Sequence, residues 1–208
     1  MYRIFYAEKD TTLYERYPEQ NAGIDQILEL TKHASGSKIE GKIRAKTYNS
    51  RILIDFGSEI DTLISAVNNG DIPPIGRPTN SASVYLSLKS SDASDLLREY
   101  SLKAFPISQS WQNGNGNRND TPKTTNGSSW YYRNSKDQAT YWNTGSVQYN
   151  WKAGTSEKLG GGTWITGSTF EASQSFKNEI PDVRINVTDI VNNWVKGNIT
   201  NNGFIIKR

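Results

Sequence analysis

The sequence predicts an all-β fold, an antiparallel β-sandwich with two short helices. Short apolar stretches alternate with polar residues at a period of two, and turns rich in glycine, asparagine and proline separate them. Two stretches, residues 59–69 and 189–196, place apolar residues at helical spacing. The last stretch, 181–208, joins a strand, a short helix, a turn and a second strand, and we expect it to close the sandwich.

The closing stretch carries the clearest local signals. Apolar and polar residues alternate over 183–187, as in a half-buried strand. Thr188 stands where a helix N-cap would, and Asp189 is favourable in a first helical turn. A helix this short is stable only when it packs against the rest of the protein. We therefore expect Trp194 to be buried at one end of the sandwich, with residues 204–206 forming the next strand.

The preceding chain supplies the other elements. Residues 48–57 contain a short apolar run bounded by glycine, typical of a strand, and residues 59–69 have the i, i+3, i+4, i+7 spacing of a helix. The apolar spacing over 24–30 fits a helix or a strand, and residues 39–46 are weakly patterned. The remaining expected elements are a strand or arm over 2–6, strands over 12–17, 82–88, 100–104 and 169–176, and a long loop over 113–129.

Composition excludes several classes of protein. The net charge of +3 is too small to indicate nucleic-acid binding by charge alone. With no cysteine and one histidine, the chain offers no disulfide framework, no thiolate nucleophile and no plausible zinc site. The first 20 residues contain no apolar run long enough for a signal peptide or a membrane span. We expect neither nucleic acid nor a membrane among the partners.

Five of the six tryptophans lie between Trp111 and Trp164, beside loops rich in asparagine and glycine. One interpretation is a saccharide platform, in which aromatic faces cover sugar C–H surfaces while amides bind the hydroxyls. The other is a set of buried corners that seal the ends of a sandwich. The candidate glycan-binding residues are Trp130, Tyr132, Trp142 and Trp151.

No arrangement of catalytic residues can be recognised in the sequence, and we expect that the protein is not an enzyme. The carboxylate pairs Asp10/Glu15 and Glu157/Glu171 could serve a glycosidase, but nothing in the sequence fixes their separation. His33 is expected to be an exposed loop residue, because its neighbours do not define a triad.

Three other features invite interpretation. Asp55 interrupts an apolar strand, so we expect it to face solvent or to pair with Arg51. Residues 160–162 lack the Lys-Ser/Thr of a phosphate loop and are predicted to be flexible glycine chain. The oxygen-bearing residues over 113–120 do not have the spacing of an EF-hand calcium loop.

Three motifs carry a family resemblance. They are S-R-I-L-I-D-F at 50–56, S-Q-S-W-Q-N-G-N-G at 108–116, and D-V-R-I-N-V-T-D-I-V-N-N-W-V-K-G at 182–197 with N-N-G-F-I-I-K at 201–207. Together they resemble DNRLRE-type domains, which are jelly-roll sandwiches similar to carbohydrate-binding modules and are found on cell surfaces and in phage virions.

The resemblance adds structural expectations. It implies a jelly-roll sandwich over 11–208 preceded by an arm or first strand over 1–10, and it favours a strand over 26–32. It implies a final apolar strand beyond 204–206, so we expect the chain to lack its last strand. Modules of this kind often carry a structural calcium, which is the one cofactor that the resemblance leaves open.

It also adds functional expectations. Residues 6–30 and 47–57 are similar to structural proteins of marine myophages. The resemblance implies a non-enzymatic virion protein of a tailed bacteriophage, placed in the tail, neck, baseplate or capsid surface, whose partners are copies of itself and other virion proteins. The alternatives are a module that binds host polysaccharide and a polysaccharide lyase or hydrolase.

Overall fold

A computed structural model describes residues 2–39, 42–76, 81–91, 99–143, 147–150, 155–158, 160–177 and 182–208. Contacts divide the chain into two compact units. Unit 1 comprises residues 1–9, 54–108 and 164–208, and unit 2 comprises residues 10–53 and 109–163. The described part is mostly β, with antiparallel strand pairing and two short helices, as the sequence predicts. The predicted boundaries, 1–10 and 11–208, stay predictions.

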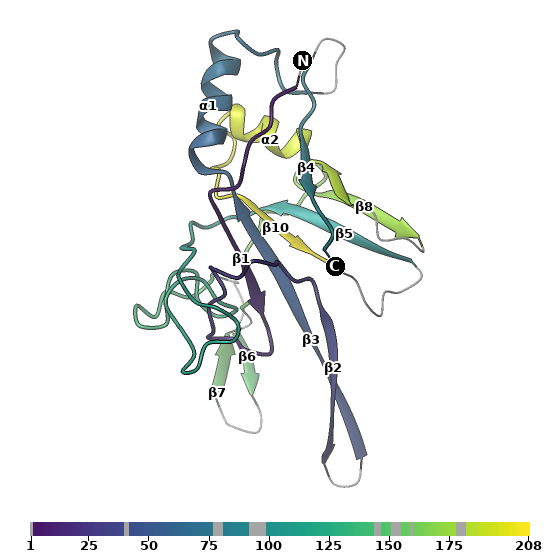
Figure 1. The fold of residues 1–208 in the computed structure, drawn as a ribbon, viewed down its shortest axis with the longest axis vertical. Helices are drawn as coiled ribbons and strands as arrows, with labels where there is room; N and C mark the ends of the chain where they lie inside the picture. The colour runs from purple at the N-terminus through teal and green to yellow at the C-terminus, as the bar shows by residue number, and fades with distance from the viewer. Residues whose placement is uncertain are drawn as a thin grey trace. The chain divides into compact units, whose positions relative to one another are not determined.

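Unit 1 contains two sheets (Figure 1). In the larger, β5 lies between β10 and β8, and the end of β3 borders β10. The smaller is the antiparallel pair β4–β9. The bounds are β3 Lys42–Asp55, β4 Tyr85–Leu88, β5 Glu99–Pro106, β8 Ala172–Lys177, β9 Val183–Asn186 and β10 Phe204–Lys207.

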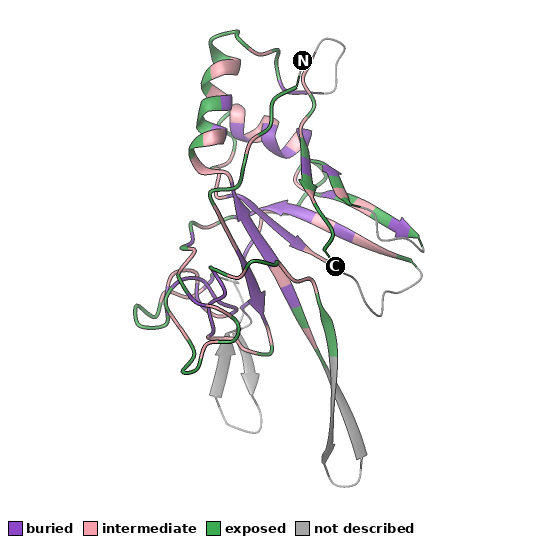
Figure 2. Ribbon diagram, viewed as in Figure 1, coloured by how far each residue is buried: buried purple, intermediate pink, exposed green. Residues whose placement is uncertain are grey.

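Binary patterning explains why these strands form one buried face. Ala104 of β5 lies opposite Ile206 of β10, and both are fully buried. On the other face, the Ser101 and Ser175 hydroxyls are 2.9 Å apart, between strands β5 and β8. Apolar residues therefore alternate with polar ones along β5, and Figure 2 shows the buried residues following β3, β10 and β5.

The two helices, α1 (Gly57–Asn68) and α2 (Thr188–Val195), are amphipathic elements of unit 1. The predicted N-cap role of Thr188 is wrong. Its hydroxyl accepts a hydrogen bond from the backbone N–H of Val84 at 2.9 Å, so it joins α2 to the chain entering β4 instead. Neither helix in the described part of the chain has the length and apolar content needed to cross a bilayer.

Trp194 is buried, as the sequence predicts, with 3% of its surface exposed. Its ring lies 4.7 Å from that of Phe204, at 57°. The indole N–H has no hydrogen-bond partner. The ring therefore stabilises unit 1 by packing, and the unpaired indole N–H reduces this stabilisation because it loses its hydrogen bond to water.

Unit 2 contains most of β1 (Lys9–Tyr14), the hairpin of β2 (Lys32–Ile39) with β3, and the pair β6 (Val147–Asn150) and β7 (Thr155–Lys158). Strand β1 is a neighbour of β3. The hairpin runs from the pair Lys32↔Asn49 to the pair Ile39↔Lys42. The weakly patterned residues 42–46 therefore belong to β3. The prediction of a loop at His33 is wrong, although His33 is exposed on its strand.

The predicted strand over 26–32 is wrong, since β2 begins only at Lys32. Hydroxyl groups replace a strand ladder here. Thr12 Oγ1 accepts the N–H of Glu29 at 3.1 Å, and Ser50 Oγ accepts the N–H of Thr31 at 2.6 Å. Ser50 Oγ also donates to the Glu29 carbonyl at 2.6 Å. Apolar spacing carries no sign of such side-chain hydrogen bonds.

Two further expectations are wrong. Asp55 is buried and its carboxylate lies 2.8 Å from the Lys9 ammonium, because Lys9 and Asp55 lie on neighbouring strands; it is not paired with Arg51. Residues 160–162 are buried rather than flexible. The positive φ of Gly161, 81°, is open to glycine at little cost, and its N–H donates to the Trp130 carbonyl at 2.5 Å.

Replacing Trp194 tests the packing of unit 1. Trp194→Ala should lower the free energy of unfolding by about 3–5 kcal/mol, because it leaves a cavity beside Phe204. Trp194→Phe should cost less than about 2 kcal/mol, since it keeps a ring and removes the unpaired N–H. Urea unfolding followed by circular dichroism measures both. Equal losses for the two variants would contradict this account of the site.

Candidate binding site

Three of the four candidate glycan-binding residues are buried in the structure. Trp130, Tyr132 and Trp142 are 5%, 6% and 2% exposed, and Trp151 lies outside the described residues. The Trp142 indole N–H donates to the Ser129 carbonyl at 2.9 Å. These three rings have no free face for a sugar, so the alternative interpretation, buried aromatic anchors, is the one that the structure favours.

Arg51 explains the burial of Trp130. Its guanidinium lies 4.7 Å from the centre of the Trp130 ring and also donates to the Gly161 carbonyl. Burial lowers the pKa of Arg51, with the Glu15 carboxylate acting in the opposite direction. The guanidinium stays charged at neutral pH, because the unperturbed pKa of arginine lies far above 7. The Arg51–Trp130 contact therefore anchors a loop to β3.

A buried asparagine organises the irregular chain of unit 2. The Asn21 side-chain amide donates to the Asn113 carbonyl at 2.7 Å and to the Ser128 carbonyl at 2.8 Å. Its Oδ1 accepts the N–H of Gly23 at 3.1 Å and that of Gly116 at 2.8 Å. One side chain thus satisfies four backbone groups that have no strand partner, and it fixes the loop after residue 113.

This loop positions Arg118. The Gln20 amide donates to the carbonyls of Asn117 and Arg118, at 3.1 and 2.5 Å. Asp120 Oδ2 accepts the Thr124 hydroxyl at 2.5 Å and the Asn117 N–H at 2.9 Å. These two bonds, the hydroxyl first, hold the pKa of the Asp120 carboxyl below its usual value.

The same contacts bear on the structural calcium that the resemblance leaves open. Asp120, the carboxylate of the 113–120 loop, already accepts two hydrogen bonds from its own turn. Within the described ranges, no group of three or more His, Cys, Asp or Glu residues is arranged to hold a metal ion.

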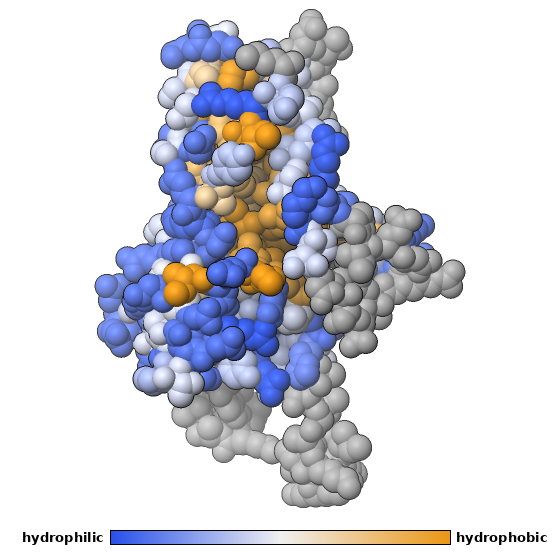
Figure 3. All heavy atoms as spheres, in the orientation of Figure 1, coloured by the Kyte–Doolittle hydropathy of each residue, from blue (hydrophilic) through white to orange (hydrophobic). Residues whose placement is uncertain are grey.

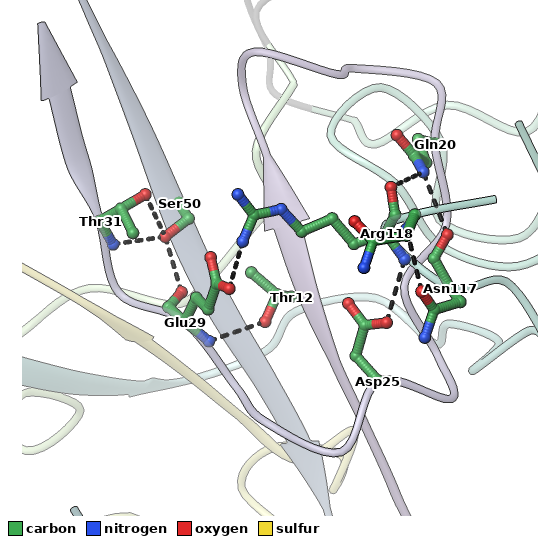
Figure 4. Close-up of polar contacts among 9 residues, drawn as sticks. Thr12, Gln20, Asp25, Glu29, Thr31, Ser50, Asn117 and Arg118 are labelled. Atoms are coloured by element: carbon green, nitrogen blue, oxygen red, sulfur yellow. Dashed lines mark hydrogen bonds and ion pairs between the residues drawn. The ribbon is translucent and has the colours of Figure 1, made fainter. Parts of the chain in front are cut away.

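Arg118 borders a surface hollow of about 170 Å³ in unit 2. Figure 4 shows its side chain reaching towards Glu29, another lining residue. Three lining residues are tyrosines, and each of the others carries a hydroxyl, amide, imidazole, carboxylate or guanidinium group. The lining residues are Tyr14, Arg16, Tyr17, Glu29, Thr31, His33, Tyr48, Asn49 and Arg118.

The centre of the hollow is an ion pair beside a buried phenol. The Arg118 guanidinium pairs with the Glu29 carboxylate and lies 5.3 Å from the centre of the Tyr14 ring. Burial, and next the charge of Glu29, raise the pKa of Tyr14, so the phenol is neutral at physiological pH. Its Oη lies near Thr12 and Arg118 but makes no hydrogen bond of good geometry.

The rim of the hollow is held by Glu15. Its carboxylate accepts the backbone N–H of Asn49 at 2.9 Å and the Asn49 side-chain N–H at 3.0 Å. Asp10, the other member of one carboxylate pair, is half-buried, and burial raises its pKa. Of the second pair, Glu171 binds Lys103 and the Glu157 side chain is outside the description. Glu15 therefore fixes the backbone at the rim of the hollow.

Comparison of the chain with family models, with curated proteins and with solved structures found no match.

Sequence reasoning missed the hollow because its residues come from four separate segments, 14–17, 29–33, 48–49 and 118. The Asn21-Ala22-Gly23 turn was the one legible signal nearby. It marks a position where an asparagine side chain bonds the backbone two residues on. Nothing in the turn indicates that the same amide also bonds residues 113, 116 and 128.

Asn21→Asp tests the organisation of this loop. The change replaces two N–H donors by oxygen, so a carboxylate faces the carbonyls of Asn113 and Ser128. We expect the free energy of unfolding to fall by about 2–4 kcal/mol. Asn119→Asp, at an exposed site in the same loop, is the matched control and should change it by less than about 0.5 kcal/mol. Equal effects in a thermal or urea unfolding series would contradict the assignment.

Proposed function

We propose that this chain is a non-enzymatic structural protein of a tailed-bacteriophage virion, built on a jelly-roll sandwich of the DNRLRE type and assembled through protein–protein contacts. Its partners are copies of itself and other virion proteins, and its place is the tail, neck, baseplate or capsid surface. The motifs at 50–56, 108–116 and 182–197 support the family, and the exposed arm of unit 1 supports an assembly role.

The observation that carries the proposal is the arm over residues 2–7. Tyr2, Ile4 and Tyr6 are 87%, 60% and 75% exposed, and they alternate along a segment outside every strand and helix. They make up half of the large hydrophobic side chains that are exposed in the described part of the chain. Figure 3 shows further hydrophobic residues gathered in the middle of the drawn face, with hydrophilic residues on either side.

Such an arm is a feature of assembling proteins. An extended segment with large side chains at every second position can add to a sheet edge on a neighbour, with its backbone forming the ladder. Burying three such side chains stabilises a contact by several kcal/mol at about 25 cal/mol per Å². Left in water, they have no role in the core of their own unit.

Locating the protein in virions tests the proposed structural role directly. Purified virions that encode this chain should contain it at a fixed copy number, measured by quantitative mass spectrometry of intact particles. An antibody against the chain should label one region of the particle in electron micrographs. Recovery of the chain only from cell lysate, and never from particles, would overturn the proposal.

The arm provides a second test on the isolated chain. Tyr2→Ser/Ile4→Ser/Tyr6→Ser should lower self-association or incorporation into particles at least about tenfold, because it removes the apolar contacts. Sedimentation velocity and a particle-incorporation assay measure this. Ile24→Ser/Ile27→Ser/Tyr85→Ser removes the other three exposed hydrophobic side chains and is the matched control. If both triple variants assemble like the unaltered chain, the arm is not an assembly element.

A further inference from the structure

The arm over residues 2–7 is anchored to unit 1 at its root. The Glu8 N–H donates to the Asp55 carbonyl at 2.9 Å, and the Glu8 carboxylate accepts the Ser58 N–H at 2.9 Å. Lys9 pairs with Asp55 at 2.8 Å. No backbone hydrogen bond joins residues 2–7 to the rest of the described chain, and Figure 2 shows most of this segment exposed. The backbone of the arm is therefore open to pairing with another strand.

The arm has two different faces. Tyr2, Ile4 and Tyr6 occupy alternate positions of this extended segment and are exposed, so they form one apolar face. Arg3 and Phe5 occupy the positions between them. Phe5 is half-buried, and the Arg3 guanidinium lies 5.0 Å from the centre of its ring. The face of Phe5 is thus partly covered, and the face of the two tyrosines is the one left to a partner.

The sequence of the arm is complementary to itself in one antiparallel register. In this register Ile4 lies opposite Ile4 of a second copy. Tyr2 then lies opposite Tyr6, and Arg3 opposite Phe5. Residues directly opposite in an antiparallel pair share a face, and aromatic and β-branched pairs of this kind stabilise a sheet. The Arg3 cation meets an aromatic ring instead of a like charge.

Other registers lose this match. A shift of one residue places Ile4 opposite Phe5, so the apolar face of each copy meets the half-buried face of the other. A shift of two residues places Arg3 opposite Arg3 in one direction, and like charges in this position repel. In the other direction it places Tyr2 opposite Glu8, whose N–H is already bonded within unit 1. The register centred on Ile4 is therefore the favoured one.

We propose that the arms of two copies pair as an antiparallel ribbon centred on Ile4, and that the chain forms a symmetric dimer in this way. The partner of the apolar face is then a second copy of the chain, and the same residues contribute from both sides. The inference rests on the assembly role proposed above, for which it names the partner and the register.

The size of the contact indicates a reversible dimer. A tyrosine buries about 150–250 Å² when fully covered, so two tyrosines in each of two arms supply at most about 1,000 Å². Stable, specific interfaces bury about 1,200–2,000 Å². We therefore expect monomer and dimer to exchange in solution, and additional contacts within an assembly to strengthen the pairing.

Single cysteines report the register directly, because the chain has no cysteine of its own. Residues directly opposite in an antiparallel pair have Cα atoms about 4.5–5.5 Å apart, which a disulfide spans. In oxidised glutathione, Ile4→Cys should cross-link to itself at least about tenfold faster than Ile24→Cys, since pairing raises the effective thiol concentration. Ile24 is an exposed isoleucine of unit 2 and serves as the control. Non-reducing gels taken over time measure both rates.

A mixture of two variants tests the register without altering Ile4. Tyr2→Cys mixed with isotope-labelled Tyr6→Cys should give mainly mixed dimers, because these positions lie opposite each other in the ribbon. Mass spectrometry separates mixed dimers from dimers of either variant alone. A random distribution among the three products would overturn the register.

Sedimentation velocity of the full chain measures the dimer without cross-linking. The unaltered chain should form more dimer as its concentration rises. Ile4→Asp places two carboxylates opposite each other and should weaken dimerisation at least about tenfold. Ile24→Asp should leave dimerisation unchanged, and circular dichroism confirms that both variants are folded.

The outcomes separate this inference from the proposed function. A chain that stays monomeric at every concentration, or Ile4→Cys that cross-links no faster than Ile24→Cys, would overturn the pairing. If the triple serine variant of the arm nevertheless loses incorporation into virions, the arm docks on another virion protein and the structural role stands. Paired arms in a chain that is absent from virions would support the dimer and overturn the virion role.

Discussion

The side-chain amide of Asn21 is the constraint on which the irregular half of this protein depends. It offers two donors and an acceptor that takes two hydrogen bonds. Backbone groups use all of them, one from the same turn and three from distant segments. An aspartate or a leucine of similar size could not satisfy both kinds of group. The neighbouring glycines fit this arrangement, since a Cβ on Gly114 would lie 2.4 Å from the Asn21 side-chain oxygen. The close approach of the backbone at Gly114 and the buried amide of Asn21 therefore depend on each other.

The hollow of unit 2 follows from that constraint. Gly116 is fixed by Asn21, Asn117 and Arg118 are held by Gln20, and Arg118 then reaches Glu29. Each step is a hydrogen bond or an ion pair between groups far apart in sequence, so the hollow depends on the loop as much as on the strands. Unit 1 is organised differently, by alternating strands and the burial of the Trp194 ring. Unit 2 thus combines the burial of aromatic side chains with polar satisfaction of irregular backbone, whereas unit 1 depends mainly on apolar packing.

That difference explains what the sequence could predict. The helix with Trp194 and the strands of unit 1 were predictable because periodicity records which residues face a core. The strand predicted over 26–32 was wrong because Thr12 and Ser50 hydroxyls bond that backbone, a contact with no periodic signature. The tryptophans were identified as candidates, yet their burial depends on partners such as Arg51 that come from another segment. A sequence shows the type of each residue, but it does not show which polar side chains from distant segments contact one another.

Hydrogen exchange of two backbone amides measures the central constraint directly. The N–H groups of Gly23 and Gly116 lie outside every strand and helix, and both donate to Asn21 Oδ1. If that oxygen holds them, both amides should exchange about a thousandfold or more slowly than free amides, as strand amides do. Two-dimensional NMR in D₂O measures both exchange rates, and we expect the two amides to be slowed to a similar extent. Exchange of either amide at the rate of an exposed loop would contradict the account.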